Sequence, residues 1–290
     1  MTIELAIKIL SGAALFTLLF AAGLRLTPSE VWVALRDWRR LLALGFVNFV
    51  VVPGLTVGAS LLFRVDAATA TAMVLLGAAP FAPVVPVFTR LARADLALAA
   101  GLTAVFPVFC TFFTPLACRA GLALLPPSGE LKFQTLSILA TLLATASAPL
   151  ALGIATRSLF PETSTRMIRP SEITSEAVGA ASLIFVVSSQ FRSMLATGWT
   201  PVLAMVLVSE AALLLGYACG GRDPAARKVT GLGTANRNIA LAILVAADSF
   251  PGSPVLGGVV ANGLLLLLLG LLHVGLWRLL DLRKSSATQG

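Results

Sequence analysis

The stretch "TGLGTANRNIALA", residues 230–242, carries one arginine deep in an apolar part of the chain. Arg237 lies between Asn236 and Asn238. A guanidinium group only donates hydrogen bonds, whereas an amide both donates and accepts them. Charged residues inside membrane bundles usually mark substrate or ion pathways. The three residues are therefore candidates for binding an anion. The alternative is structural: an arginine strut, flanked by amides that bond between helices.

Glu210, in "MVLVSEAALLLGY" (residues 205–217), is the acidic residue that lies well inside an apolar run. Two roles are open for it: a partner that neutralises Arg237, or a carboxyl group that carries a proton. Because each residue is the lone deep charge of its sign, we expect the two to meet directly or through one water.

Asn48 and Thr103 complete the candidate substrate- or ion-binding residues, although threonine can also bond its own helix backbone. His273 precedes Trp277 by one helical turn and is expected at the membrane interface. No nucleophile pairs with it, no phosphate-cradling loop is present, and the three cysteines lack metal spacing. The sequence thus predicts neither an enzyme nor a resident cofactor.

Composition determines what must position these residues. The chain has 290 residues, of which 58% are hydrophobic and 12% charged, with a mean hydropathy of +0.94. Uncharged runs cover residues 41–63, 67–89, 96–118 and 133–156. Each is long enough for a membrane-spanning helix, which needs about 20 residues, and open sheets cannot span lipid. The chain is therefore predicted to be a single all-α membrane domain over residues 1–290.

Two of the predicted membrane spans contain helix breakers. Proline is concentrated in "PFAPVVP" (residues 80–86), and Gly and Asn in "GLGTANRN" (residues 231–238). We expect both segments to be non-helical and to cross near the middle of the membrane, as paired interrupted helices do in transporters. This predicts an inverted repeat, with a first half over about 1–125 and a second over about 131–282. The expected spans are 5–25, 40–63, 67–92, 96–124, 131–158, 174–193, 199–219, 228–251 and 254–280, about nine in all.

The net charge of +8 reflects orientation in the lipid bilayer and does not indicate nucleic acid. With nine spans, most of the 21 Lys and Arg residues fall on one side. The positive-inside rule then puts the N-terminus outside and the C-terminus in the cytoplasm of a multi-pass cell-membrane protein. The longest connector expected, residues 157–176, is too short for a soluble domain.

Four segments resemble the bile acid:sodium symporter family in order and spacing. They are "AAGLRLTPSEVWVALRDWRRLLALGFVNFVVVP" (21–53), "FTRLARADLALAAGLTAV" (88–105), "SEAALLLGYACG" (209–220) and "DPAARKVTGLGTANRNIALA" (223–242). The resemblance implies an inverted repeat with a panel domain and a core domain, two broken helices crossing in the core, and a cavity between the domains. It also implies an amphipathic or carboxylated organic anion as the substrate.

The chain departs from the family at the positions that would hold sodium. The family's Ser-Asn pair at the first break falls on Val85 and Pro86, and a serine on the next helix falls on Ala99. In the second broken helix, the family's Glu and Gln fall on Gly233 and Arg237. Sodium, like other hard cations, needs several oxygen ligands, and these residues offer no side-chain oxygen.

A few of the family's polar positions are kept or changed to other polar residues. Thr103 and Asn238 match, Asn48 stands for a glutamine, and Ser209-Glu210 stands for a His-Asn pair. We therefore expect an alternating-access transporter of a small organic anion that does not depend on sodium. Alternatives are a proton-coupled carrier or uniporter of a small solute, and a non-transporting membrane receptor.

Overall fold

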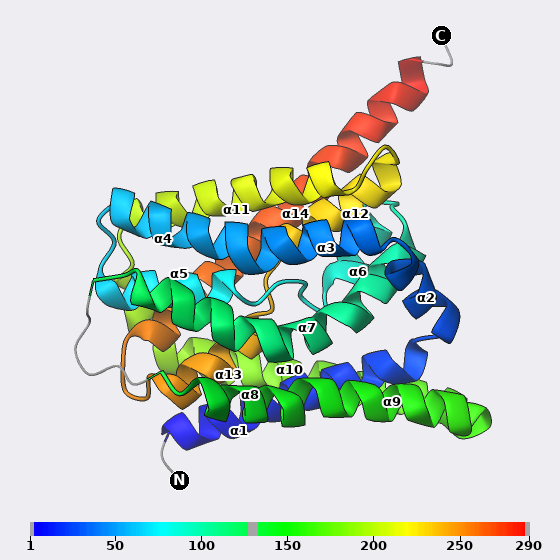
Figure 1. The fold of residues 1–290 in the computed structure, drawn as a ribbon, viewed down its shortest axis with the longest axis horizontal. Helices are drawn as coiled ribbons and strands as arrows, with labels where there is room; N and C mark the ends of the chain where they lie inside the picture. The colour runs from blue at the N-terminus through cyan, green and yellow to red at the C-terminus, as the bar shows by residue number, and fades with distance from the viewer. Residues whose placement is uncertain (1–2, 127–132, 288–290) are drawn as a thin grey trace.

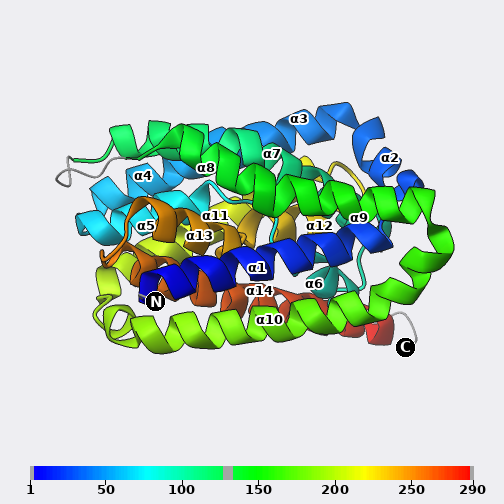
Figure 2. The ribbon, with the colours of Figure 1, turned by 90° about the horizontal axis from the view of Figure 1, so that it is seen from below.

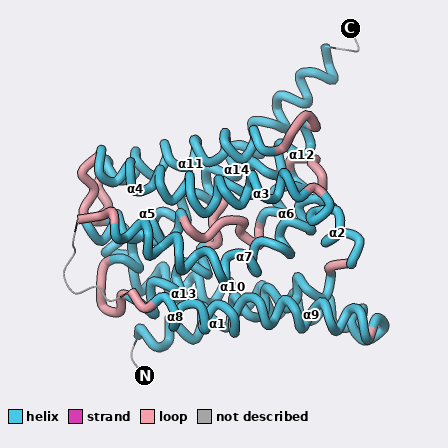
Figure 3. Tube along the Cα trace, in the orientation of Figure 1, coloured by secondary structure: helices cyan, strands magenta, loops and turns pink. Residues whose placement is uncertain are grey.

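The computed structural model describes residues 3–126 and 133–287, and in this part of the chain it is all helical, without strands (Figures 1 and 3). The α-helices are α1 (Ile3–Arg25), α2 (Pro28–Arg36), α3 (Trp38–Phe46), α4 (Val52–Leu62), α5 (Ala67–Gly77), α6 (Val85–Leu91), α7 (Leu96–Ala123), α8 (Thr135–Leu142), α9 (Ala148–Leu159), α10 (Pro161–Leu195), α11 (Trp199–Cys219), α12 (Pro224–Ala235), α13 (Ile239–Ser249) and α14 (Val255–Ala287). Two π-helical turns, η1 (Val47–Val51) and η2 (Leu143–Ser147), join α3 to α4 and α8 to α9.

Eight helical segments of the described chain are long and apolar enough to cross a membrane. The third predicted span is additional: it is interrupted, and its first half, α5, is a short apolar helix. The all-helical, multi-pass prediction is thus confirmed. One boundary was wrong, because α10 begins at Pro161 and residues 161–173 are helical, not part of a long connector. Pro161 fits the first turn of the helix. The polar residues that follow it are the first turns of α10 and precede its apolar part.

The helices form two layers. In Figure 1, α1, α8, α9 and α10 lie together along the lower edge, and in Figure 2 α1, α9 and α10 lie on the face nearest the viewer. Gly23 and Gly153 allow the close crossing of α1 and α9. A Cβ atom at either position would lie 2.5 Å from a backbone oxygen of the other helix. The other helices lie above these in Figure 1, with α5, α6 and α7 at mid-height and α3, α4 and α11 farther up. They are called the upper layer here, and it contains the candidate residues.

Both π-helical turns end two residues before a proline, Pro53 or Pro149. Proline has no backbone N–H and cannot continue the α-helical hydrogen-bond ladder. The extra residue in the turn accommodates this loss, and such π-bulges are frequent at functional sites. The first turn places Asn48 in the interior, fully buried.

The two helix breaks lie against each other. Residues 78–84 separate α5 from α6, and residues 236–238 separate α12 from α13. Three backbone hydrogen bonds join the breaks: the N–H groups of Phe81, Ala82 and Asn238 donate to the carbonyl oxygens of Gly233 (3.1 Å), Asn236 (3.0 Å) and Ala79 (2.7 Å).

Both segments are therefore interrupted, as predicted, and the two breaks meet; the first lies two residues earlier than expected, and the second is shorter than expected. Residues 231–235 and Pro86 are helical. Proline is tolerated in the first turn of α6, and the glycines of α12 serve close packing instead of bending the chain.

Candidate functional site

Phe81 fills the crossover between the two broken helices. Its ring is buried, stacks on Phe106 with 3.9 Å between ring centroids, and lies against Gly233 of α12. A Cβ atom at position 233 would lie 2.1 Å from a ring carbon of Phe81. Phe81 also has φ +57°, a left-handed conformation that costs a bulky residue energy. The absence of a side chain at Gly233 thus makes room for this ring.

Arg237 lies in the second break and is 3% exposed. Its Nη1 donates a hydrogen bond to Oδ1 of Asn48 at 3.0 Å. The amide nitrogen of Asn48 in turn donates to the carbonyl oxygen of Leu44 (2.9 Å) and to the hydroxyl of Thr234 (3.2 Å). This network fixes the asparagine so that it presents its oxygen to the guanidinium. The other terminal nitrogen of Arg237, Nη2, is buried without a hydrogen-bond partner.

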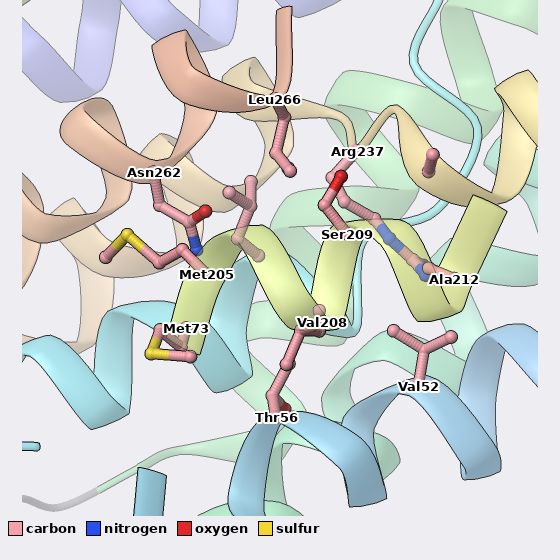
Figure 4. Close-up of a pocket in the computed structure, with 13 residues that line it drawn as sticks. Val52, Thr56, Met73, Met205, Val208, Ser209, Ala212, Arg237, Asn262 and Leu266 are labelled. Carbon is pink, nitrogen blue, oxygen red and sulfur yellow. The ribbon is translucent and has the colours of Figure 1, made fainter. Parts of the chain in front are cut away.

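Arg237 lines a small cavity in the upper layer, shown in Figure 4. Its internal free volume is about 20 Å³, enough for a water molecule or an ion of similar size. The wall includes residues from α4, α5, α11 and α14, among them Thr56, Ser209 and Asn262. None of its lining residues belongs to α1, α8, α9 or α10, so this cavity lies within one layer and not between the two.

Glu210 does not form the predicted direct pair with Arg237. Its Oε2 lies 3.0 Å from Nε2 of His273 on α14, and none of the ion pairs among the described residues includes Arg237. Consecutive residues of a helix point about 100° apart. Ser209 therefore lines the cavity, whereas the carboxylate of its neighbour Glu210 contacts His273 on α14. Within the part of the chain that the structure describes, the guanidinium thus has an amide oxygen as its partner and no carboxylate.

The sequence interpretation placed His273 at the membrane interface and did not predict its contact with Glu210. Nδ1 of His273 lies 2.6 Å from the carbonyl oxygen of Leu269, which can only accept, so Nδ1 carries a proton. A hydrogen bond between Nε2 and Glu210 then requires one more proton, held by either partner. The available signal was that His273 is the single histidine of the chain and interrupts an apolar run.

The other candidates lie at or near the crossover without lining the cavity. Asn238 caps α13, accepting a hydrogen bond from the N–H of Leu241 at 3.1 Å. The amide nitrogen of Asn236 donates to the carbonyl oxygen of Leu232 at 2.9 Å, and its Oδ1 is buried without a partner. The buried hydroxyl of Thr103 on α7 also lacks a partner. Among the six candidates, the structure joins only Arg237 and Asn48 by a side-chain hydrogen bond.

Comparison with known families gives one match. Residues 13–197 match the family described as Sodium Bile acid symporter family. The matched part contains Asn48, Phe81 and Thr103, whereas Glu210 and Arg237 follow it in the chain. A search of curated proteins finds no match.

Proposed function

Because the chain belongs to the sodium bile acid symporter family, we propose that it is a secondary transporter that carries a small organic anion across the cell membrane. The observation that supports an anion is the buried guanidinium of Arg237, which has no carboxylate partner among the described residues. A fixed positive charge in a low-dielectric interior favours negative solutes and opposes cations. The N-terminal end of α13, capped by Asn238, adds partial positive charge at the same break.

We further propose that sodium does not drive this transport. The contacts of Phe81 leave no room for an acidic side chain at Gly233, and Arg237 supplies positive charge permanently where a bound cation would supply it reversibly. A permanent charge cannot couple a substrate to a gradient of that cation. In this proposal Asn48 holds the guanidinium in place, and Asn236, Asn238 and Thr103 line the substrate path in another state of the transport cycle.

The two layers suggest how alternating access would proceed. The layer of α1, α8, α9 and α10 would act as the panel and the remaining helices as the core. The panel would move against the crossover to open a path on either side. In this proposal the halves of an inverted repeat divide near residues 125–131, and the N-terminus lies outside and the C-terminus inside.

Proton coupling is the second candidate and rests on the contact of Glu210 with His273. The carboxylate oxygen and the imidazole nitrogen lie 3.0 Å apart, within the distance at which two such groups share a proton. Glu210 directly follows Ser209, which lines the same cavity as Arg237. A change in the contact between Glu210 and His273 would therefore be transmitted along α11 to that cavity.

The test is uptake into proteoliposomes of carboxylates and sulfonates of increasing size, each paired with its neutral amide analogue. A carrier of anions without a compensating cation moves net charge, so we expect saturable uptake that rises with an inside-positive potential. Neutral analogues should not be taken up. A dependence on an imposed pH gradient would favour proton coupling, and its absence a uniporter. Binding without uptake would contradict the proposal and favour a receptor.

A further inference from the structure

Arg237 has one terminal nitrogen that none of the described residues satisfies. Nη2 is buried and has no hydrogen-bond partner, and Arg237 lines the cavity of about 20 Å³. Leaving a charged donor unsatisfied in a protein interior costs several kcal/mol by the usual order of magnitude. The position therefore calls for a negative ligand.

The cavity wall offers hydrogen-bond donors in an otherwise apolar shell (Figure 4). The Ser209 hydroxyl and the Asn262 amide lie on it, and both residues are buried. The hydroxyl of Thr56 is already committed to the carbonyl oxygen of Pro53, at 2.6 Å. No Asp or Glu lines the cavity. The remaining lining residues are Val52, Met73, Leu76, Gly77, Met205, Val208, Ala212, Ala235 and Leu266.

We propose that this cavity binds one halide-sized monovalent anion, chloride under ordinary conditions, as the counter-ion of Arg237. The cavity has room for a small ligand, and a monatomic anion can accept hydrogen bonds from any direction. Water would satisfy the hydrogen bond of Nη2 but would leave the charge uncompensated. This inference uses the same unpaired guanidinium as the transport proposal: the ion would neutralise Arg237 in the resting protein and would have to leave before an organic anion could pair with the guanidinium.

The experiment is equilibrium binding of radiolabelled chloride to the purified protein in detergent, by scintillation proximity, with gluconate as the balancing anion at constant ionic strength. We expect saturable binding of one chloride per chain, displaced by bromide. Arg237→Gln should weaken it at least tenfold and Ser209→Ala to a smaller extent. The matched control is Arg222→Gln, which removes an exposed arginine and should leave binding unchanged.

Thermal unfolding of the wild-type protein gives a second readout that does not require the variants to fold. Chloride and bromide should raise the midpoint relative to gluconate, since a ligand stabilises the state that binds it. If acetate raises the midpoint and chloride does not, the site binds a carboxylate and the halide assignment is overturned. Absence of saturable chloride binding would mean that the cavity holds water only, and binding that persists in Arg237→Gln would mean that chloride binds elsewhere; either result would overturn the proposal. Uptake of organic anions could succeed or fail in either case.

Discussion

Gly233→Ala is expected to lower the free energy of unfolding by about 1–3 kcal/mol, the usual cost of overpacking a well-packed interior. Alanine normally stabilises a helix relative to glycine by up to about 1 kcal/mol, so the expected sign is reversed here. The cause is the Phe81 ring, which a Cβ atom would approach to 2.1 Å. The ring cannot easily retreat, because it stacks on Phe106 and its backbone N–H donates to Gly233 itself.

Phe81→Ala provides the matched background for this test. That change alone removes a buried aromatic ring and should cost about 3–5 kcal/mol. With the ring gone, adding Gly233→Ala should cost almost nothing more, which thermal unfolding of the single and double variants would reveal. Gly58→Ala is the control, because a Cβ atom there meets nothing within 4 Å. An equal cost of Gly233→Ala in both backgrounds would show that Phe81 does not fill the crossover.

Arg237→Gln is expected to reduce uptake of the anionic substrate by about 10- to 100-fold, the equivalent of losing one charged hydrogen bond of about 1.5–3 kcal/mol. Stability should change far less. The variant loses the bond to Asn48 but also removes a charge whose placement in a membrane costs about 2.5–3.5 kcal/mol. These effects oppose each other. In this variant the uptake rate should therefore fall while the midpoint of thermal unfolding changes little.

The control for this separation is Arg222→Gln, at an exposed position between α11 and α12, which should leave both measurements unchanged. A variant of Arg237 that unfolds while the residual folded protein retains full uptake would show that the arginine is a strut only. Asn48→Ala distinguishes the two roles further, because it leaves the charge in place while removing the partner of Nη1.

The all-helical architecture, eight of the nine expected spans and the two helix breaks were predictable because they depend on local signals. Uncharged runs of sufficient length predict spans, and the prolines before α6 and the Asn-Arg-Asn run after α12 predict breaks. The start of α10 was missed because its first turns are polar. Polar contacts hold these turns to α1: the Ser164 hydroxyl donates to the carbonyl oxygen of Leu24, and Glu172 pairs with Arg25. Apolar length alone does not show where a helix leaves the membrane.

The partners of Arg237 and Glu210 were not predictable from position in the chain, and Glu210 is not the deep charge that was expected, because 38% of its side chain is exposed. Which face of α11 points to α14 depends on the rotation of each helix, and the cavity-lining Ser209 and the His273 partner Glu210 are consecutive residues. The contact of Phe81 with Gly233 joins residues of different broken helices and has no local signal. Sequence reasoning identified Arg237, Glu210 and Asn48 as candidates but assigned the wrong partner to the first two.

The most direct test of the central proposal, that the guanidinium of Arg237 takes the place of a coupling cation, is uptake measured with sodium replaced. Proteoliposomes would take up the preferred anion at fixed pH and membrane potential, with sodium on both sides exchanged for choline. We expect the initial rate to remain the same, because the positive charge at the crossover belongs to the protein. A rate that falls without sodium and saturates as sodium is restored would contradict the proposal and identify the protein as a sodium symporter.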